Sequence, residues 1–145
     1  INDLNESARF DTILYIDVLE HIEKDAQELA RANKHLRAGG KLIVLSPAYE
    51  KLYSPFDKEI GHFRRYDKKS LAALTPSKSK IDKMIYLDAL GVLLSFANRL
   101  LLRQHTPTDR QIQFWDKRII PLSRFLDPLV GYRAGRSVLG IWEKI

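Results

Sequence analysis

Two short apolar runs, separated by a helical stretch and a double glycine, constrain the fold of this chain more than any other feature. Residues 12–16 (TILYI) are apolar almost throughout and rich in β-branched and aromatic side chains, which is typical of a strand buried on both faces. Residues 25–37 have helical periodicity and are followed by Gly39-Gly40, a common helix stop. Residues 41–45 (KLIVL) predict a second strand. The pattern therefore predicts a βαβ unit with parallel strands.

Capping signals predict where two helices begin. Asp25 is followed three residues later by Glu28, which is the spacing of a capping box. Asp67 precedes a short predicted helix over residues 68–74 in the same way. Between these helices, beyond the second strand, residues 47–66 are predicted to form a long loop rich in aromatic and charged side chains, and loops of this length are often functional.

The second half of the chain predicts further helices and two more strands. Residues 80–87 and 137–142 predict strands, and residues 89–103 predict a strongly apolar helix. A second helix is expected over residues 110–126, with Trp115, Ile119 and Leu122 on one side. The apolar stretch 85–102 is interrupted by polar residues and is too short to cross a membrane, so a buried helix is favoured over an interfacial one.

Composition limits the class of protein. At 145 residues the chain corresponds to one domain, and the absence of cysteine excludes disulfides and thiol chemistry. The net charge is +6, of which +5 falls in residues 83–145. This excess of positive charge could favour anionic partners, but scattered solvated side chains are the simpler explanation because basic residues do not form a long run.

Polar residues follow both predicted parallel strands. Asp17, Glu20 and His21 come after the first strand, and Ser46 comes after the second. Ligands bind outside the carboxyl ends of strands in open parallel sheets, so these residues are expected at the functional edge. Taken alone, the acids could simply stabilise a helix start and the histidine could be structural.

Four sequence segments resemble one known family. These are FDTILYIDVLEHI (10–22), LRAGGKLIVLSPA (36–48), SPFDKEIGHFRRYDKKSL (54–71) and GRSVLGIWEK (135–144). They look like the second half of class I S-adenosylmethionine-dependent methyltransferases, closest to the small-molecule group labelled type 11 or type 12. The resemblance covers essentially the whole chain, and its motifs are most specific up to Leu74.

The resemblance implies an α/β fold with a partial Rossmann-like sheet. The chain would supply strands 4 to 7 of the family fold, the last of them antiparallel. We expect a single partial methyltransferase domain over residues 1–145. It would comprise a motif-bearing core over 12–74, a variable helical region over 75–136 and the last strand over 137–145.

The resemblance also implies a cofactor and the residues that contact it. S-adenosylmethionine would meet Asp17, Val18 and Leu19 largely through backbone groups, and Asp3 matches the acid that commonly accepts a hydrogen bond from adenine. The family's glycine-rich motif and ribose-binding acid have no counterpart here, since Gly39-Gly40 follows a helix rather than a strand. We therefore expect methyl transfer to a small molecule only as the C-terminal portion of an enzyme, inactive alone.

Catalytic and acceptor-binding candidates come from both motifs. His21 and His62 are the candidate bases, because histidine titrates near neutral pH. The remaining polar residues of the motifs are candidates for holding the acceptor, and arginine suits an anionic one. They are Glu20, Arg64, Arg65 and Tyr66.

A metal is a further question raised by the resemblance. Asp17-x-x-Glu20-His21 resembles a pattern by which some O-methyltransferases hold a divalent metal, for which oxygen ligands would suit Mg²⁺. Many relatives with a similar Leu-Glu-His are thought to bind none, and the first acid is one methylene shorter here. We therefore expect no metal.

Partners and compartment follow from the same considerations. The first predicted strand would be an exposed apolar edge without a neighbour, so we expect a fragment, a dimer or a swapped oligomer. The alternative to an enzyme is a non-catalytic methyltransferase-like binding module completed by a partner chain. No nucleic acid and no membrane span are expected, although contact with a lipid-like substrate is possible. The absence of a leader segment before Ile1 and of cysteine favours a cytoplasmic protein.

Overall fold

The described part of the chain is organised around a four-stranded mixed sheet. The computed structural model describes residues 4–97 and 109–145. The strand order is β1-β2-β4-β3, where β1 pairs with β2 in parallel and β4 runs antiparallel to both β2 and β3. The strands are β1 (Phe10–Ile16), β2 (Leu36–Pro47), β3 (Ser79–Leu87) and β4 (Ser137–Lys144). The carboxyl ends of β1, β2 and β3 therefore meet at one edge of the sheet, beside the start of β4.

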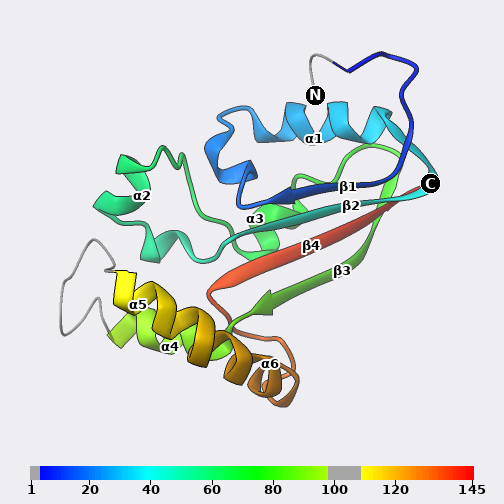
Figure 1. The fold of residues 1–145 in the computed structure, drawn as a ribbon. Helices are drawn as coiled ribbons and strands as arrows, with labels where there is room; N and C mark the ends of the chain where they lie inside the picture. The colour runs from blue at the N-terminus through cyan, green and yellow to red at the C-terminus, as the bar shows by residue number, and fades with distance from the viewer. Residues whose placement is uncertain (1–3, 98–108) are drawn as a thin grey trace.

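Most of the helices form two groups, and α2 lies apart from both in the segment after β2 (Figure 1). One group, α1 and α3, packs against a face of the sheet, while α4, α5 and α6 lie together beyond the carboxyl end of β3. The α-helices are α1 (Asp25–Lys34), α2 (Pro55–Glu59), α3 (Lys68–Ala72), α4 (Ala89–Ala97), α5 (Asp109–Phe114) and α6 (Ile120–Leu129). Shorter elements are the 3₁₀ turns η1 (Leu19–His21) and η2 (Glu50–Leu52) and a π-helical stretch η4 (Trp115–Ile119). No described helix has the length and apolar character required to cross a membrane.

The core lies between one face of the sheet and helices α1 and α3. Leu42, Val44 and Trp142 alternate with more exposed residues on their strands and are fully buried on this face. Leu29 from α1 and Leu71 from α3 close over them. This alternation is the period-two pattern of strands that bury one face.

The other face of the sheet and its β1 edge carry exposed apolar side chains. Leu14 is 60% exposed and Ile16 is 47% exposed, although both belong to the apolar run that predicted a strand buried on both faces. That prediction is wrong within the described residues, because only alternate side chains, Ile13 and Tyr15, point toward α1. The pairing order leaves β1 with β2 as its neighbour on one side, so the other side of β1 is a sheet edge.

The predicted capping box at the start of α1 is wrong. Lys24 is the N-cap and offers no side-chain hydrogen bond to the helix. The carboxylate of Asp25 instead accepts from Arg64 Nη1 at 2.7 Å and from the hydroxyl of Tyr66 at 2.8 Å. Glu28 accepts a hydrogen bond from Tyr15. Both acids therefore make tertiary contacts, and Asp25 Oδ1 also accepts locally from the Ala26 N–H at 2.7 Å.

The double glycine belongs to a strand rather than to a helix end. Helix α1 ends at Lys34, and β2 already begins at Leu36. The register between β1 and β2 shifts between Phe10 and Thr12, opposite the glycines, and Gly39 has a φ of 75° there. The left-handed residue predicted from the sequence is present, but it forms an irregularity in the sheet.

The remaining predictions for the elements are mostly confirmed. Asp67 and Ser70 form a capping box at the start of α3, and β3 and β4 match the two later predicted strands. The loop over residues 47–66 contains η2 and α2, the latter started by a capping box between Ser54 and Asp57. Ile119 is buried as expected, whereas Leu122 is 51% exposed. The apolar helix is described only to Ala97, and the rest of its predicted range lies outside the described residues.

Candidate functional site at the carboxyl edge of the sheet

The chain turns sharply where β1 ends. Asp17 has a φ of 51°, a left-handed conformation that is uncommon for a residue other than glycine. Its N–H still donates to the Leu45 carbonyl at 2.9 Å, so the turn is fixed to the end of β2. Burial raises the pKa of Asp17, and electrostatic interactions with His62, Arg136 and His21 act to lower it. An acid in a left-handed conformation beside an arginine and two histidines marks this edge as a site candidate.

Glu20 is a buried carboxylate with one unpaired oxygen. Its side chain has no exposed surface, and Oε2 accepts from the Ser46 hydroxyl at 2.9 Å. Oε1 has no hydrogen-bond partner. Burial raises the pKa of this group. The Glu20 carbonyl accepts from the N–H of Phe63, which ties η1 to the segment that carries His62.

His62 is held in place by Asp57. Asp57 Oδ1 lies 2.9 Å from His62 Nδ1, and both side chains are more than nine-tenths buried. Because the carboxylate can only accept, Nδ1 carries the proton, and in the neutral imidazole Nε2 then has a free lone pair. The imidazole of His21 packs edge-on against that of His62, with ring centroids 4.5 Å apart. The two predicted catalytic histidines therefore meet.

Asp57 also binds Arg65. Arg65 donates through Nε to Oδ1 at 2.9 Å and through Nη2 to Oδ2 at 3.0 Å, which is a bidentate pair. Burial acts to raise the pKa of Asp57, but hydrogen bonds and charge from Arg65, with hydrogen bonds from Ser54 and His62, hold that pKa at about 2. Asp57 is thus an ionised carboxylate at the centre of the loop that follows β2.

The other acceptor-binding candidates are anchored to α1. Arg64 pairs with Asp25 and donates to the Glu23 carbonyl at 2.9 Å, while about a third of its side chain remains exposed. Tyr66 is almost fully buried, and burial together with its hydrogen bond to Asp25 raises its pKa. These contacts fix the aromatic and basic segment onto the start of α1.

The predicted cofactor residues occupy different environments. Val18 is 44% exposed at the edge, next to Asp17. The Leu19 side chain is fully buried in the core, so a ligand could contact this residue only through its backbone. The Leu19 carbonyl already accepts a hydrogen bond from the Ile22 N–H. Asp3 lies outside the described residues. The structure therefore brings together Asp17, Glu20, His21 and His62, with Arg65 joined to them through Asp57.

Sequence reasoning missed Asp57 and Arg136 as members of this edge. Asp57 orients His62, and Arg136, just before β4, contributes positive charge near Asp17. Ser46, which the sequence placed at this edge, donates to Glu20. A signal for Asp57 existed, since Ser54-x-x-Asp57 has the spacing of a capping box. Nothing in the local sequence indicated that Arg136 would return to the same edge.

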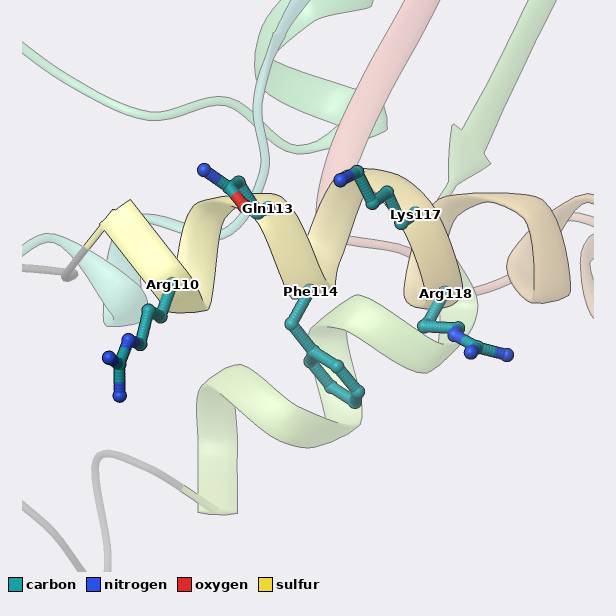
Figure 2. Close-up of a pocket in the computed structure, with 5 residues that line it drawn as sticks. All are labelled: Arg110, Gln113, Phe114, Lys117 and Arg118. Carbon is teal, nitrogen blue, oxygen red and sulfur yellow. The ribbon is translucent and has the colours of Figure 1, made fainter.

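A separate shallow hollow lies on α5 and η4, within the helical group formed by α4, α5, η4 and α6. Figure 2 shows Arg110, Phe114 and Arg118 extending from one side of α5 and η4, with Gln113 and Lys117 on the other. The ring of Phe114 is 56% exposed although the residue is large and apolar. This surface combines positive charge with an exposed aromatic ring, and it shares no lining residue with the cluster at the strand ends.

Comparison with known proteins gives a likeness of fold. No family model and no curated protein matches the sequence. The solved structure of the (4+2)-cyclase SpnF matches with a TM-score of 0.53 at 15% identity, covering 94% of this chain and 50% of that one. StiE O-MT (TM-score 0.46, 17% identity) covers 94% and 44% respectively, and Haemonchus contortus phosphoethanolamine N-methyltransferase 2 with S-adenosyl-L-methionine (TM-score 0.47, 12% identity) covers 93% and 33%.

These likenesses concern the arrangement of the chain. The chain spans about half the length of the cyclase SpnF, whose TM-score is 0.53. The fold of this chain, a mixed α/β arrangement with a four-stranded sheet, is similar to that structure over 94% of the chain. One fold serves many unrelated chemistries, so activity has to be argued from the side chains at the strand ends.

Proposed function

We propose that this chain is the acceptor-side portion of an S-adenosylmethionine-dependent methyltransferase that acts on a small molecule, and that it is inactive alone. The observation that carries the proposal is the cluster of Asp17, Glu20, His21 and His62 at the carboxyl edge of β1 and β2. This is the edge at which α/β sheets bind ligands. Two further observations support the proposal. The last strand, β4, is antiparallel, as the resemblance to methyltransferases implies, and the sequence motifs themselves resemble that family.

In this proposal the end of β1 meets the methionine and methyl end of the cofactor. Asp17 and Val18 are accessible there, and Leu19 takes part through its backbone. Asp3 is proposed for the adenine contact on the basis of the resemblance alone. When bound, S-adenosylmethionine supplies an activated methyl group. The chain's own residues position the acceptor and exclude water.

His62 is the proposed base, with Asp57 as its positioning residue. Asp57 fixes the Nδ1 proton, which leaves Nε2 to take a proton from an acceptor hydroxyl or amine as the acceptor attacks the methyl carbon. The methyl group would come from S-adenosylmethionine, whose sulfur would keep the electron pair of the broken carbon–sulfur bond. His21 is the second candidate, because its ring lies against that of His62 and it is more exposed.

The acceptor is proposed to contact the segment after α2. Arg64 retains exposed surface that could contact an anionic group. The side chains of Arg65, Tyr66 and Glu20 already bind protein groups, so we propose that they support the site rather than contact the acceptor. An anionic or hydroxylated small molecule fits this arrangement.

The helical group supports a lipid-like or amphiphilic acceptor, or contact with an anionic lipid surface. Leu93, Phe125 and Leu129 are 65%, 75% and 81% exposed, and Phe114 lies among basic side chains (Figure 2). An apolar helix surface flanked by Lys and Arg is typical of segments that bind anionic membrane surfaces.

A second candidate is a non-catalytic binding module completed by another chain. The exposed edge of β1, with Leu14 and Ile16 beside it, favours this reading, because apolar edges readily pair with a further strand. A dimer or swapped oligomer through β1 would satisfy the same edge.

The two candidates differ in whether they bind S-adenosylmethionine. We expect protein expressed from the natural gene to bind the cofactor in a calorimetric titration and to transfer its labelled methyl group to a small-molecule extract. Asp17→Ala should weaken binding, and the matched surface variant Asp11→Ala should not. A natural gene product without affinity for S-adenosylmethionine would overturn the enzyme proposal and leave the binding module.

A further inference from the structure

The unpaired oxygen of Glu20 requires a partner of some kind. Of the buried side-chain nitrogen and oxygen atoms in residues 4–97 and 109–145, Oε1 of Glu20 is the one without a hydrogen bond. The side chain has no exposed surface, so bulk water cannot solvate this oxygen. A buried carboxylate oxygen without a partner is destabilising, so this oxygen is suited to bind a water molecule or an ion.

His62 is too far from this oxygen to be its hydrogen-bond partner. His62 Nε2 lies 3.9 Å from Glu20 Oε1, which is beyond hydrogen-bond distance. The separation is less than twice the usual metal–ligand distance of about 2.0–2.2 Å, so one ion between the two atoms can contact both. His62 Nδ1 donates to Asp57, and this contact directs the lone pair of Nε2 away from Asp57.

A third ligand atom completes the set. His21, Glu20 and His62 each offer one ligand atom, and the three atoms lie within 4.8 Å of one another. They come from η1 and from the segment after α2, which the hydrogen bond between Phe63 N–H and the Glu20 carbonyl holds together. The Asp57–His62 pair is the carboxylate–histidine arrangement that orients metal-binding imidazoles.

We propose that Glu20, His21 and His62 form a binding site for one divalent first-row transition metal, with Zn²⁺ as the fitting ion. Two imidazoles and one carboxylate favour Zn²⁺ or Co²⁺ over Mg²⁺, which prefers oxygen ligands. Three protein ligands leave a coordination position open. The set differs from the one that the sequence suggested, because it includes His62 and excludes Asp17. It also departs from the expectation that no metal is bound.

Bound metal would change what the site can do. With its Nε2 on the ion, His62 would no longer be a free base. The open position would receive an oxygen of the acceptor or a water molecule, and the ion would lower the pKa of a bound hydroxyl. Metal binding does not depend on the proposed methyl transfer, so either proposal can fail without the other.

Cobalt titration tests the site directly. Protein expressed from the natural gene is dialysed against a chelator and titrated with Co²⁺, whose d–d absorption reports its ligands. We expect one Co²⁺ per chain, with an absorption band that Zn²⁺ abolishes and that excess Mg²⁺ leaves in place. His21→Ala and Glu20→Gln should each weaken binding at least 100-fold, and Asp57→Asn should weaken it about 10- to 100-fold.

A matched histidine controls for general effects. His35 contacts the Ala8 carbonyl and is not part of the cluster, so His35→Ala should leave the Co²⁺ band unchanged. His21 is exposed, and its alanine variant should keep the far-ultraviolet circular dichroism of the parent. Absence of a Co²⁺ band in the parent protein, or a band unchanged in the folded His21→Ala and Glu20→Gln variants, would overturn the proposal.

Discussion

Asp57 binds His62 and Arg65 at the same time, with its Oδ1 2.9 Å from both His62 Nδ1 and Arg65 Nε. One buried carboxylate thus fixes a candidate base and neutralises a largely buried guanidinium. We predict that Asp57→Asn lowers the free energy of unfolding by about 3 kcal/mol, since it leaves the charge of Arg65 without its partner.

Urea denaturation at pH 7 measures this loss. Glu59→Gln, on the same helix α2 but exposed, is the control and should change the free energy of unfolding by less than about 0.5 kcal/mol. A loss of less than about 1 kcal/mol in the free energy of unfolding for Asp57→Asn would contradict a stabilising role of this carboxylate in the loop.

Gly40 allows β1 and β2 to approach each other at the irregularity in their pairing. A Cβ at this position would lie 2.9 Å from the Arg37 carbonyl oxygen and 3.1 Å from that of Asp11. Both are backbone atoms that cannot rotate away, so Gly40→Ala should destabilise the fold by about 1–3 kcal/mol. Thermal unfolding followed by circular dichroism would measure the change.

Substitutions at the neighbouring Gly39 test backbone strain without steric crowding. Gly39 has a φ of 75° with no atom near its Cβ position, so Gly39→Asn should cost much less than Gly39→Val. Equal stabilities for Gly40→Ala and the parent would show that the strands separate without penalty.

Glu143 joins three strands through charge. Its carboxylate binds Lys41 on β2 and Lys80 on β3, at 2.7 and 2.9 Å, and both lysines are its partners in strand register. Hydrogen bonds from Lys41 and Lys80 lower its pKa to about 2, below that of an unfolded chain. The stability from this group is therefore complete above about pH 5 and is lost as the pH falls toward 2.

Glu143→Gln tests this pH dependence. The variant should be less stable than the parent at pH 7, and the difference between the two should shrink as the pH falls from 5 to 2. Urea midpoints at several pH values measure both. A difference that does not vary with pH would assign the effect to packing rather than to charge.

The sequence predicted the residues at the strand ends better than their partners. Asp17, Glu20 and His21 could be placed at the edge because the apolar run before them is unambiguous. Asp25 marked the start of a helix and Gly39 a left-handed residue, but the predicted capping box does not form and the glycine lies at a sheet irregularity. The Asp25 carboxylate instead accepts from the Tyr66 hydroxyl. Such long-range contacts leave no periodic trace in a single sequence.

The same limit explains the loop after β2. His62 and Asp57 are five residues apart, yet their contact depends on the fold of α2, which is too short for its periodicity to be detected. Ser46 and Glu20 meet because β1 and β2 are paired, and this was predictable in outline from the βαβ pattern. The sequence was therefore enough to predict which residues lie near one another at this edge. It was not enough to predict which of them form hydrogen bonds with each other.

The β1 edge predicts self-association. Leu14 is 60% exposed on β1, the edge strand of the described sheet, so we expect the 145-residue chain to form dimers or larger species in size-exclusion chromatography with light scattering. Leu14→Lys should shift the distribution toward monomer, because a charge at an edge opposes strand pairing. Leu93→Lys alters an equally exposed leucine on α4 and should not. A concentration-independent, folded monomer of the parent would contradict this expectation.

The helical group predicts binding to anionic lipid. Phe125 and Leu129 on α6 are 75% and 81% exposed. Lys117 and Arg118, drawn in Figure 2, lie on η4, which directly precedes α6. We expect protein to co-sediment with vesicles containing phosphatidylglycerol but not with pure phosphatidylcholine. The double variant Phe125→Ser, Leu129→Ser should bind vesicles at least about tenfold more weakly, because it removes the two apolar side chains expected to insert into the lipid.

Charge and position can be tested separately. Lys117→Gln and Arg118→Gln should each weaken binding about fivefold and reduce its salt dependence, in line with about 1 kcal/mol per basic residue at an anionic surface. Ile145→Ser removes an equally exposed apolar side chain at the far end of the sheet and is the matched control. Unchanged vesicle binding by the double variant would exclude α6 as the contact, and equal binding to both lipids would exclude the electrostatic contribution.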